Sequence, residues 1–200
     1  MRKNAFRLAL IFGLLCAVFV SFAQFNAACE DMRTNVLRLH IIANSDSSAD
    51  QSLKLEIRDR ILEKSGELFK ETDNIEGAIK DAEASLEEIT AVANEVIGEK
   101  GYPYKANARI GDSYFETREY DNFTLPAGTY KSLIITLGEG EGKNWWCVIF
   151  PEICLPAARD ASLSDAVREE SAHIAENPKR YKIAFKSIEI YEDIKKFFKK

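Results

Sequence analysis

Hydrophobic and polar positions follow one another with two different periods along the chain. Residues 36–43 alternate with a period of two, which predicts a strand, and residues 49–69 and 75–97 then carry apolar positions at helical spacing. Between residues 104 and 150 the period of two returns, and beyond residue 162 the pattern is helical again. This order predicts an α+β fold, in which an antiparallel sheet of about five strands is covered on one face by helices.

The remaining elements follow from the same pattern. The run at 145–150 is apolar on both faces, so we expect it to be a central, buried strand. Ser162 and Asp165 have the spacing of a capping box, which predicts the start of a helix there. The other expected elements are strands at 104–110, 114–120 and 129–137, a short edge strand at 181–185, and helices at 163–176 and 187–200.

The first 23 residues have the three parts of an export signal. Basic residues precede an unbroken apolar run at 8–20, and the small residues at 21 and 23 suit a signal peptidase. We therefore expect a signal peptide at 1–23 that is cleaved after Ala23, with an uncleaved membrane anchor as the alternative. A linker at 24–35 and an exported domain at 36–200 would follow.

Composition and charge narrow the class of protein. Hydrophobic residues make up 46% of the chain and charged residues 30%, as in an ordinary globular domain. The formal charge is −5, and removal of the three basic residues in 1–23 makes it −8. So acidic a domain is a poor candidate for binding nucleic acid, which is held by Lys and Arg at its phosphates.

The cysteines indicate a structural bond more than chemistry. Cys29, Cys147 and Cys154 remain after removal of the signal. Two nearby cysteines in an exported protein are more often bridged than free, so we predict a disulfide between Cys147 and Cys154.

The inventory of catalytic side chains is thin. His40 and His173 are the two histidines, and they lie far apart without a second metal ligand at a suitable spacing. The chain has no Cys-x-x-Cys, no Gly-x-Ser-x-Gly and no Walker loop, since the glycine-rich stretch at 138–143 is acidic. We expect no catalytic residue, metal or cofactor. A thiol nucleophile at Cys147 with His40 as its base is the alternative.

A binding surface is the functional hypothesis that the polar residues support. By alternation Arg38 and His40 lie on the strand face opposite Leu39 and Ile41, and a polar turn follows the strand. The predicted partner-binding residues are Arg38, His40, Asn44, Asp46, Asp50 and Trp145. The C-terminal run KKFFKK at 195–200 either touches an anionic membrane or is a solvated helix end.

Two long motifs resemble one known family. The first is LRLHIIANSDS at 37–47, continued by DQ at 50–51, LKL at 53–55 and RD at 58–59. The second is LPAG at 125–128 with Tyr130, followed by glycines at 138, 140 and 142, NWWCVIFP at 144–151 and Cys154. Both are similar to the signatures of the stage II sporulation protein R family, and they occur in the same order.

This resemblance implies a role as a protein ligand in endospore formation. Members of the family are exported from the forespore toward the mother cell, where they trigger a membrane-embedded aspartic protease of the mother-cell septal membrane. The protease then processes a pro-sigma factor. The rival classes are a secreted hydrolase or thiol enzyme of the cell envelope, and a structural module of the envelope.

Overall fold

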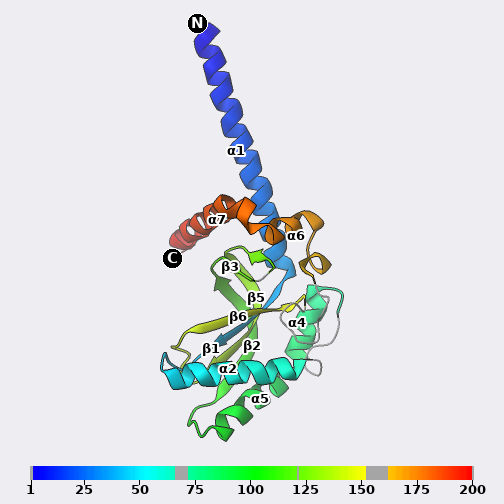
Figure 1. Cartoon of the computed structure of the whole chain (residues 1–200), viewed down its shortest axis with the longest axis vertical. Coiled ribbons are helices and arrows are strands. Elements are labelled where there is room, and N and C mark those ends of the chain that lie inside the picture. The colour runs from blue at the N-terminus through cyan, green and yellow to red at the C-terminus, as the bar shows by residue number, and fades with distance from the viewer. Residues whose placement is uncertain (1, 66–71, 121, 152–161, 200) are drawn as a thin grey trace. The chain divides into compact units, whose positions relative to one another are not determined.

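The computed structural model describes residues 2–65, 72–120, 122–151 and 162–199. Its contacts divide the chain into two compact units, which we call unit 1 and unit 2. Unit 1 comprises residues 1–32, 116–128 and 168–200, and unit 2 comprises residues 33–115 and 129–167. Figure 1 shows the elements of both.

Unit 2 is built on a four-stranded sheet. The strands are β1 (Leu37–Ile42), β2 (Ala106–Phe115), β5 (Gly128–Leu137) and β6 (Asn144–Phe150), in the order β2-β5-β1-β6. β1 pairs with β5 in parallel and with β6 antiparallel. The predicted α+β class is confirmed, but the sheet is mixed and has four strands, not five antiparallel ones. β6 lies at an edge of the order, so its predicted central position is wrong.

In the described part of unit 2, three helices pack on one face of this sheet. They are α2 (Ser48–Glu63), α4 (Ile75–Ala84) and α5 (Leu86–Glu99). Their apolar positions form one core with the odd-numbered residues of β1, Leu37, Leu39 and Ile41. The predicted helix at 75–97 is divided at Ser85, which ends α4 and begins α5.

Two further expectations for the β region are corrected. Residues 106–115 form one strand, and no turn interrupts it at the predicted position 111–113. The next strands are short: β3 (Arg118–Glu119) and β4 (Thr124–Leu125), which pair with each other in unit 1.

Unit 1 also contains α1 (Arg2–Asn35), α6 (Glu169–Glu176) and α7 (Pro178–Lys199). The stretch 24–35, expected as a linker, continues α1, and its apolar residues Phe25, Ala28, Cys29 and Met32 are buried at helical spacing. The edge strand predicted at 181–185 is wrong, because these residues belong to α7. The predicted capping box of Ser162 and Asp165 is confirmed, although it opens a short 3-10 helix at Leu163–Asp165 in unit 2.

α1 is long and apolar enough to cross a membrane. Its stretch Lys3–Asn35 has a mean hydropathy of 2.4 over the best 18-residue window, and only 6% of that window is buried. The helix is therefore compatible with either interpretation made from the sequence, a signal segment or a membrane anchor.

Candidate functional site

Two loops of unit 2 meet at the end of β1 and form the candidate site. Because β5 is parallel to β1 and β6 returns on its other side, the loop at 138–143 must cross the end of β1. There the backbone N–H of Glu141 donates to the carbonyl of Asn44 at 3.1 Å, and that of Gly142 donates to the carbonyl of Ala43 at 2.9 Å. We call residues 44–49 and 138–144 the two-loop surface.

Side chains of the first loop accept hydrogen bonds from the backbone of the second loop. The Oδ1 of Asn44 accepts from the backbone N–H of Glu139 at 3.0 Å, and the Oδ1 of Asp46 accepts from that of Lys143 at 2.7 Å. Each of these hydrogen bonds joins a side chain of the first loop to the backbone of the second. They therefore fix the backbone of the second loop relative to the first.

Asp50, in the first turn of α2, stabilises this arrangement of the two loops through hydrogen bonds to its carboxylate. Its carboxylate accepts from Asn44 Nδ2 at 2.9 Å, Ser45 Oγ at 2.5 Å and Tyr104 Oη at 2.5 Å. Burial raises the pKa of Asp50, but the hydrogen bonds from Ser45, Tyr104, Asn44 and Ser47 outweigh burial and lower it to about 2. Burial and the Asp50 carboxylate raise the pKa of the Tyr104 hydroxyl far above its usual value. The carboxylate is thus ionised at any physiological pH.

This depressed pKa makes the stability of unit 2 depend on pH in acid. Since the pKa of the carboxyl is 3.8 in the unfolded chain and about 2 in the folded one, its contribution is complete above pH 4 and is lost as the pH falls through 2. At about 1.4 kcal/mol per pKa unit, the loss is on the order of 2 kcal/mol. We expect urea unfolding of the wild-type protein to show this loss of unfolding free energy between pH 5 and pH 2. In Asp50→Asn, the loss between the two pH values should be smaller by about the same amount. An equal loss in both proteins would contradict the assignment.

Lys54 joins the two loops from the helix side. It is buried on α2, and its Nζ donates to Gln51 Oε1 at 2.7 Å and to the carbonyl of Lys143 at 2.8 Å. Burial lowers its pKa, against the charge of Asp46. Gln51 in turn donates to the carbonyl of Ser45 at 2.8 Å, so Lys54 and Gln51 connect both loops to α2.

The glycines of the second loop are required by this close approach. Gly138 has a positive φ of 54°, and a Cβ there would lie 2.1 Å from Asn44 Oδ1. A Cβ on Gly142 would lie 2.3 Å from the carbonyl oxygen of Ser45. The glycines at 138 and 142 are thus the sequence signal of this backbone contact.

The predicted partner-binding residues are only partly brought together. Asn44 and Asp46 lie in the two-loop surface, and Asp50 lies directly beneath it. Trp145 follows this surface in β6, and the Arg58 guanidinium carbon lies 5.0 Å from the centre of its ring. Lys54 and Tyr104, which complete the network, were not identified from the sequence.

Arg38 differs from its expected position. Alternation placed it on an exposed sheet face, but it is completely buried, with its guanidinium carbon 3.7 Å from the centre of the Phe115 ring and 4.9 Å from that of Tyr130. These aromatic rings provide a cation–π environment for the charge. Arg38 is thus not a surface contact, and its role is in packing.

His40 shares the face of Arg38 but is only half-buried. Its Nε2 lies 2.9 Å from Asn144 Oδ1 and its Nδ1 lies 3.2 Å from Ser113 Oγ. Burial lowers the pKa of His40, as do the charges of Arg38 and Arg109, against the hydrogen bond to Asn144. A neutral imidazole next to a hydroxyl is the start of a nucleophile–base pair of the kind that hydrolases use.

The thiol alternative fails on geometry. Cys147 is paired with Leu39 across β1 and β6, whereas His40 is paired with Trp146, so the cysteine and the histidine point to opposite faces of the sheet. Cys147 is buried. Cys154 lies outside the described residues, and the disulfide between Cys147 and Cys154 stays a prediction.

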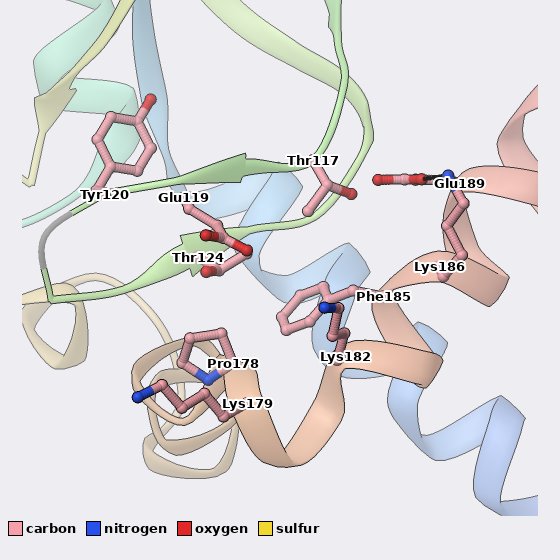
Figure 2. Close-up of a pocket in the computed structure, with 10 residues that line it drawn as sticks. All are labelled: Thr117, Glu119, Tyr120, Thr124, Pro178, Lys179, Lys182, Phe185, Lys186 and Glu189. Carbon is pink, nitrogen blue, oxygen red and sulfur yellow. Dashed lines mark hydrogen bonds and ion pairs between the residues drawn. The ribbon is translucent and has the colours of Figure 1, made fainter.

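Unit 1 contains a separate pocket of about 600 Å³ between α7 and the β3–β4 hairpin. Figure 2 shows Lys179, Lys182 and Lys186 on its α7 side, and Glu119 on the hairpin. Lys186 is paired with Glu189 at 2.5 Å. Charges of both signs thus line the pocket. Among the described residues, no group of three or more His, Cys, Asp or Glu could hold a metal ion.

Comparison with known proteins identifies the family. The family model for stage II sporulation protein R matches residues 33–160, which include the whole two-loop surface. The chain is 36% identical over 176 residues to the stage II sporulation protein R of Bacillus subtilis (strain 168), covering 85% of this chain and 77% of that protein. No solved structure matches it. The chain therefore belongs to the stage II sporulation protein R family, whose role is in sporulation.

Proposed function

We propose that this protein is an exported signal of endospore formation that activates a membrane-embedded aspartic protease. In this proposal the chain leaves the forespore, reaches the space facing the mother cell and binds the extracytoplasmic side of the protease in the mother-cell septal membrane. Activation then leads to processing of the mother-cell pro-sigma factor. Membership of the family and an N-terminal helix suited to export or anchoring both support it.

The two-loop surface is the observation that carries the proposal. It has exposed residues of both loops, including Asp46, Glu139, Glu141 and Asn144, on a backbone that is fixed by Asp50 and Lys54. A rigid surface loses little conformational entropy on binding. A ligand shifts a partner to its active state only through preferential affinity for that state, and a preorganised surface can provide such a preference.

Of the predicted residues, Asn44 and Asp46 form the proposed contact, and His40 and Trp145 flank it on opposite faces of the sheet. Of these, Asp46 is exposed, while Asn44, His40 and Trp145 are partly exposed. We place Asp50 under this surface as its support and not as a contact.

Deletion of the gene tests the role, and complementation tests the surface. We expect pro-sigma processing to stop in the deletion strain and to return with the wild-type gene. Asp46→Lys should reduce processing at least about fivefold, because reversing a charge in an interface costs on the order of 1 kcal/mol or more. Immunoblots of the pro-sigma factor during sporulation measure this.

A matched reversal at a distant exposed position is the control. Glu95→Lys, on the exposed side of α5 in the same unit, should process normally. Normal processing in the deletion strain would overturn the proposed function. Normal processing with Asp46→Lys, at unchanged protein level, would instead move the contact away from the two-loop surface.

A secreted hydrolase is the rival function, and the Ser113–His40 pair is the observation that favours it. Ser113→Ala distinguishes the two, since it removes the candidate nucleophile and leaves His40 and its hydrogen bond to Asn144 in place. Signalling by binding predicts full processing with Ser113→Ala, whereas a hydrolytic mechanism predicts its loss.

A further inference from the structure

α7 has two apolar faces, of which one is unused within unit 1. Phe185 and Ile188 are buried, and Phe185 lies 5.2 Å from Phe25 of α1, ring centre to ring centre. On the opposite side, spacings of seven, four and three residues align a second stripe. We call it the exposed stripe; it consists of Ile183, Ile190, Ile194 and Phe197, with Phe198 beside it, and Phe197 and Phe198 are 78% and 80% exposed.

The charge of α7 is opposite to that of the chain. The helix carries seven basic and three acidic residues, a net +4, in a chain of net −5. Lys179, Arg180, Lys182 and Lys186 lie in the first half of the helix, and Lys195, Lys196 and Lys199 lie near its end. Lys186, Lys195 and Lys196 are paired with the three acidic residues of the helix. A basic helix with exposed isoleucine and phenylalanine is typical of a helix that lies in a membrane interface.

The position of α7 within unit 1 points to the membrane that α1 can enter. The exposed apolar side chains of α1 extend to Val20, and α7 contacts α1 just beyond, with Tyr191 at 5.9 Å from Phe22 by ring centres. Figure 1 shows α7 running across α1 and not along it. At 1.5 Å per residue, Phe22 and Phe25 lie only about 3–8 Å below Val20 along the helix axis, which is the depth of the headgroup region.

We propose that, in the chain that keeps α1 as a membrane anchor, α7 is an interfacial helix that binds the anionic surface of the bilayer crossed by α1. The exposed stripe enters the headgroup region, and the lysines meet lipid phosphates. Two contacts then attach unit 1 to the bilayer: α1 spans it, and α7 lies flat on its surface. The combination of a hydrophobic helix and a basic amphipathic one gives stable attachment where either alone is weaker. This inference does not depend on the protease proposed above.

Hydroxyl-radical footprinting of the full chain, α1 included, tests the contact. The chain is reconstituted in phosphatidylcholine vesicles with and without phosphatidylglycerol, and oxidation of Phe197 and Phe198 is measured by mass spectrometry. We expect at least about threefold less oxidation in the anionic vesicles, since basic residues concentrate the helix on anionic lipid. Leu55, an exposed apolar residue of unit 2, is the internal reference and should not change.

Charge variants complete the test. Lys195→Glu with Lys196→Glu should abolish the protection, whereas Lys80→Glu with Lys105→Glu, at exposed positions of unit 2, should leave it intact. Equal oxidation in both kinds of vesicle overturns the proposal. Protection that rises with protein density and ignores lipid charge also overturns it, because a second copy of the chain would then cover the stripe.

Discussion

Replacing Asp50 by alanine is expected to lower the free energy of unfolding of unit 2 by about 3–4 kcal/mol. The substitution removes the acceptor of three side-chain hydrogen bonds at once, from Asn44, Ser45 and Tyr104. Each donor left without a partner in this half-buried site costs on the order of 1 kcal/mol. Urea unfolding followed by tryptophan fluorescence reports on unit 2 alone, because Trp145 and Trp146 are the only tryptophans of the chain and both lie in β6.

Two matched variants show whether the loss belongs to the network. Asp46→Ala removes an exposed carboxylate with one backbone partner and should cost less than about 1 kcal/mol. Tyr104→Phe removes one of the three donors and should cost about 1 kcal/mol. If Asp50→Ala is no more destabilising than Asp46→Ala, the loops are held by other contacts.

Gly142→Ala is expected to destabilise unit 2 by about 2–3 kcal/mol and, under the proposed function, to reduce pro-sigma processing in proportion. The added Cβ would lie 2.3 Å from the Ser45 carbonyl oxygen, 2.6 Å from its carbon and 2.9 Å from the Ala43 Cβ. Backbone atoms cannot move aside as a flexible side chain can, so the two loops must separate. The same fluorescence-detected unfolding, together with pro-sigma immunoblots, measures both effects.

Gly98→Ala is the control for Gly142→Ala. Gly98 lies in α5, and a methyl group added there would meet no heavy atom within 4 Å. Alanine at this position should therefore be neutral or stabilising by up to about 1 kcal/mol. A loss at Gly98 as large as that at Gly142 would mean that the close approach of the loops is not the cause.

Local patterns in the sequence were sufficient for most of the elements. Ser47 caps α2 through the backbone N–H of Asp50, as expected for a serine placed before an amphipathic helix. The strand predicted at 181–185 is wrong because its sequence, Tyr-Lys-Ile-Ala-Phe, fits both the strand and the helix period. Pro178 at the first helical position is the stronger signal, and it favours a helix. A short run that fits both periods takes the secondary structure of the longer element that contains it.

Non-local pairing is what the sequence could not supply. The parallel register of Arg38 with Ser132 joins strands about 90 residues apart, and no local pattern encodes it. β6 is apolar on both faces although it lies at an edge, because the face away from the helices carries its own aromatic cluster, including Phe115 beside Trp146 at 5.8 Å. The same cluster explains why Arg38, a charged residue on an alternating strand, is buried.

Local sequence patterns also identified only part of the candidate site. Asn44, Asp46 and Asp50 were selected because they are closely spaced polar residues after a strand. Tyr104, which contributes the third hydrogen bond to Asp50, comes 54 residues later and is one tyrosine among seven. Its role follows only from the fold.

The place of β1 between β5 and β6 also determines when the sheet can assemble. β1 is made first among the strands, yet neither of its neighbours is synthesised until residues 128–150. Closing so long a loop is entropically costly, and high contact order slows folding. The nascent chain therefore stays without its central sheet until about three quarters of it exist.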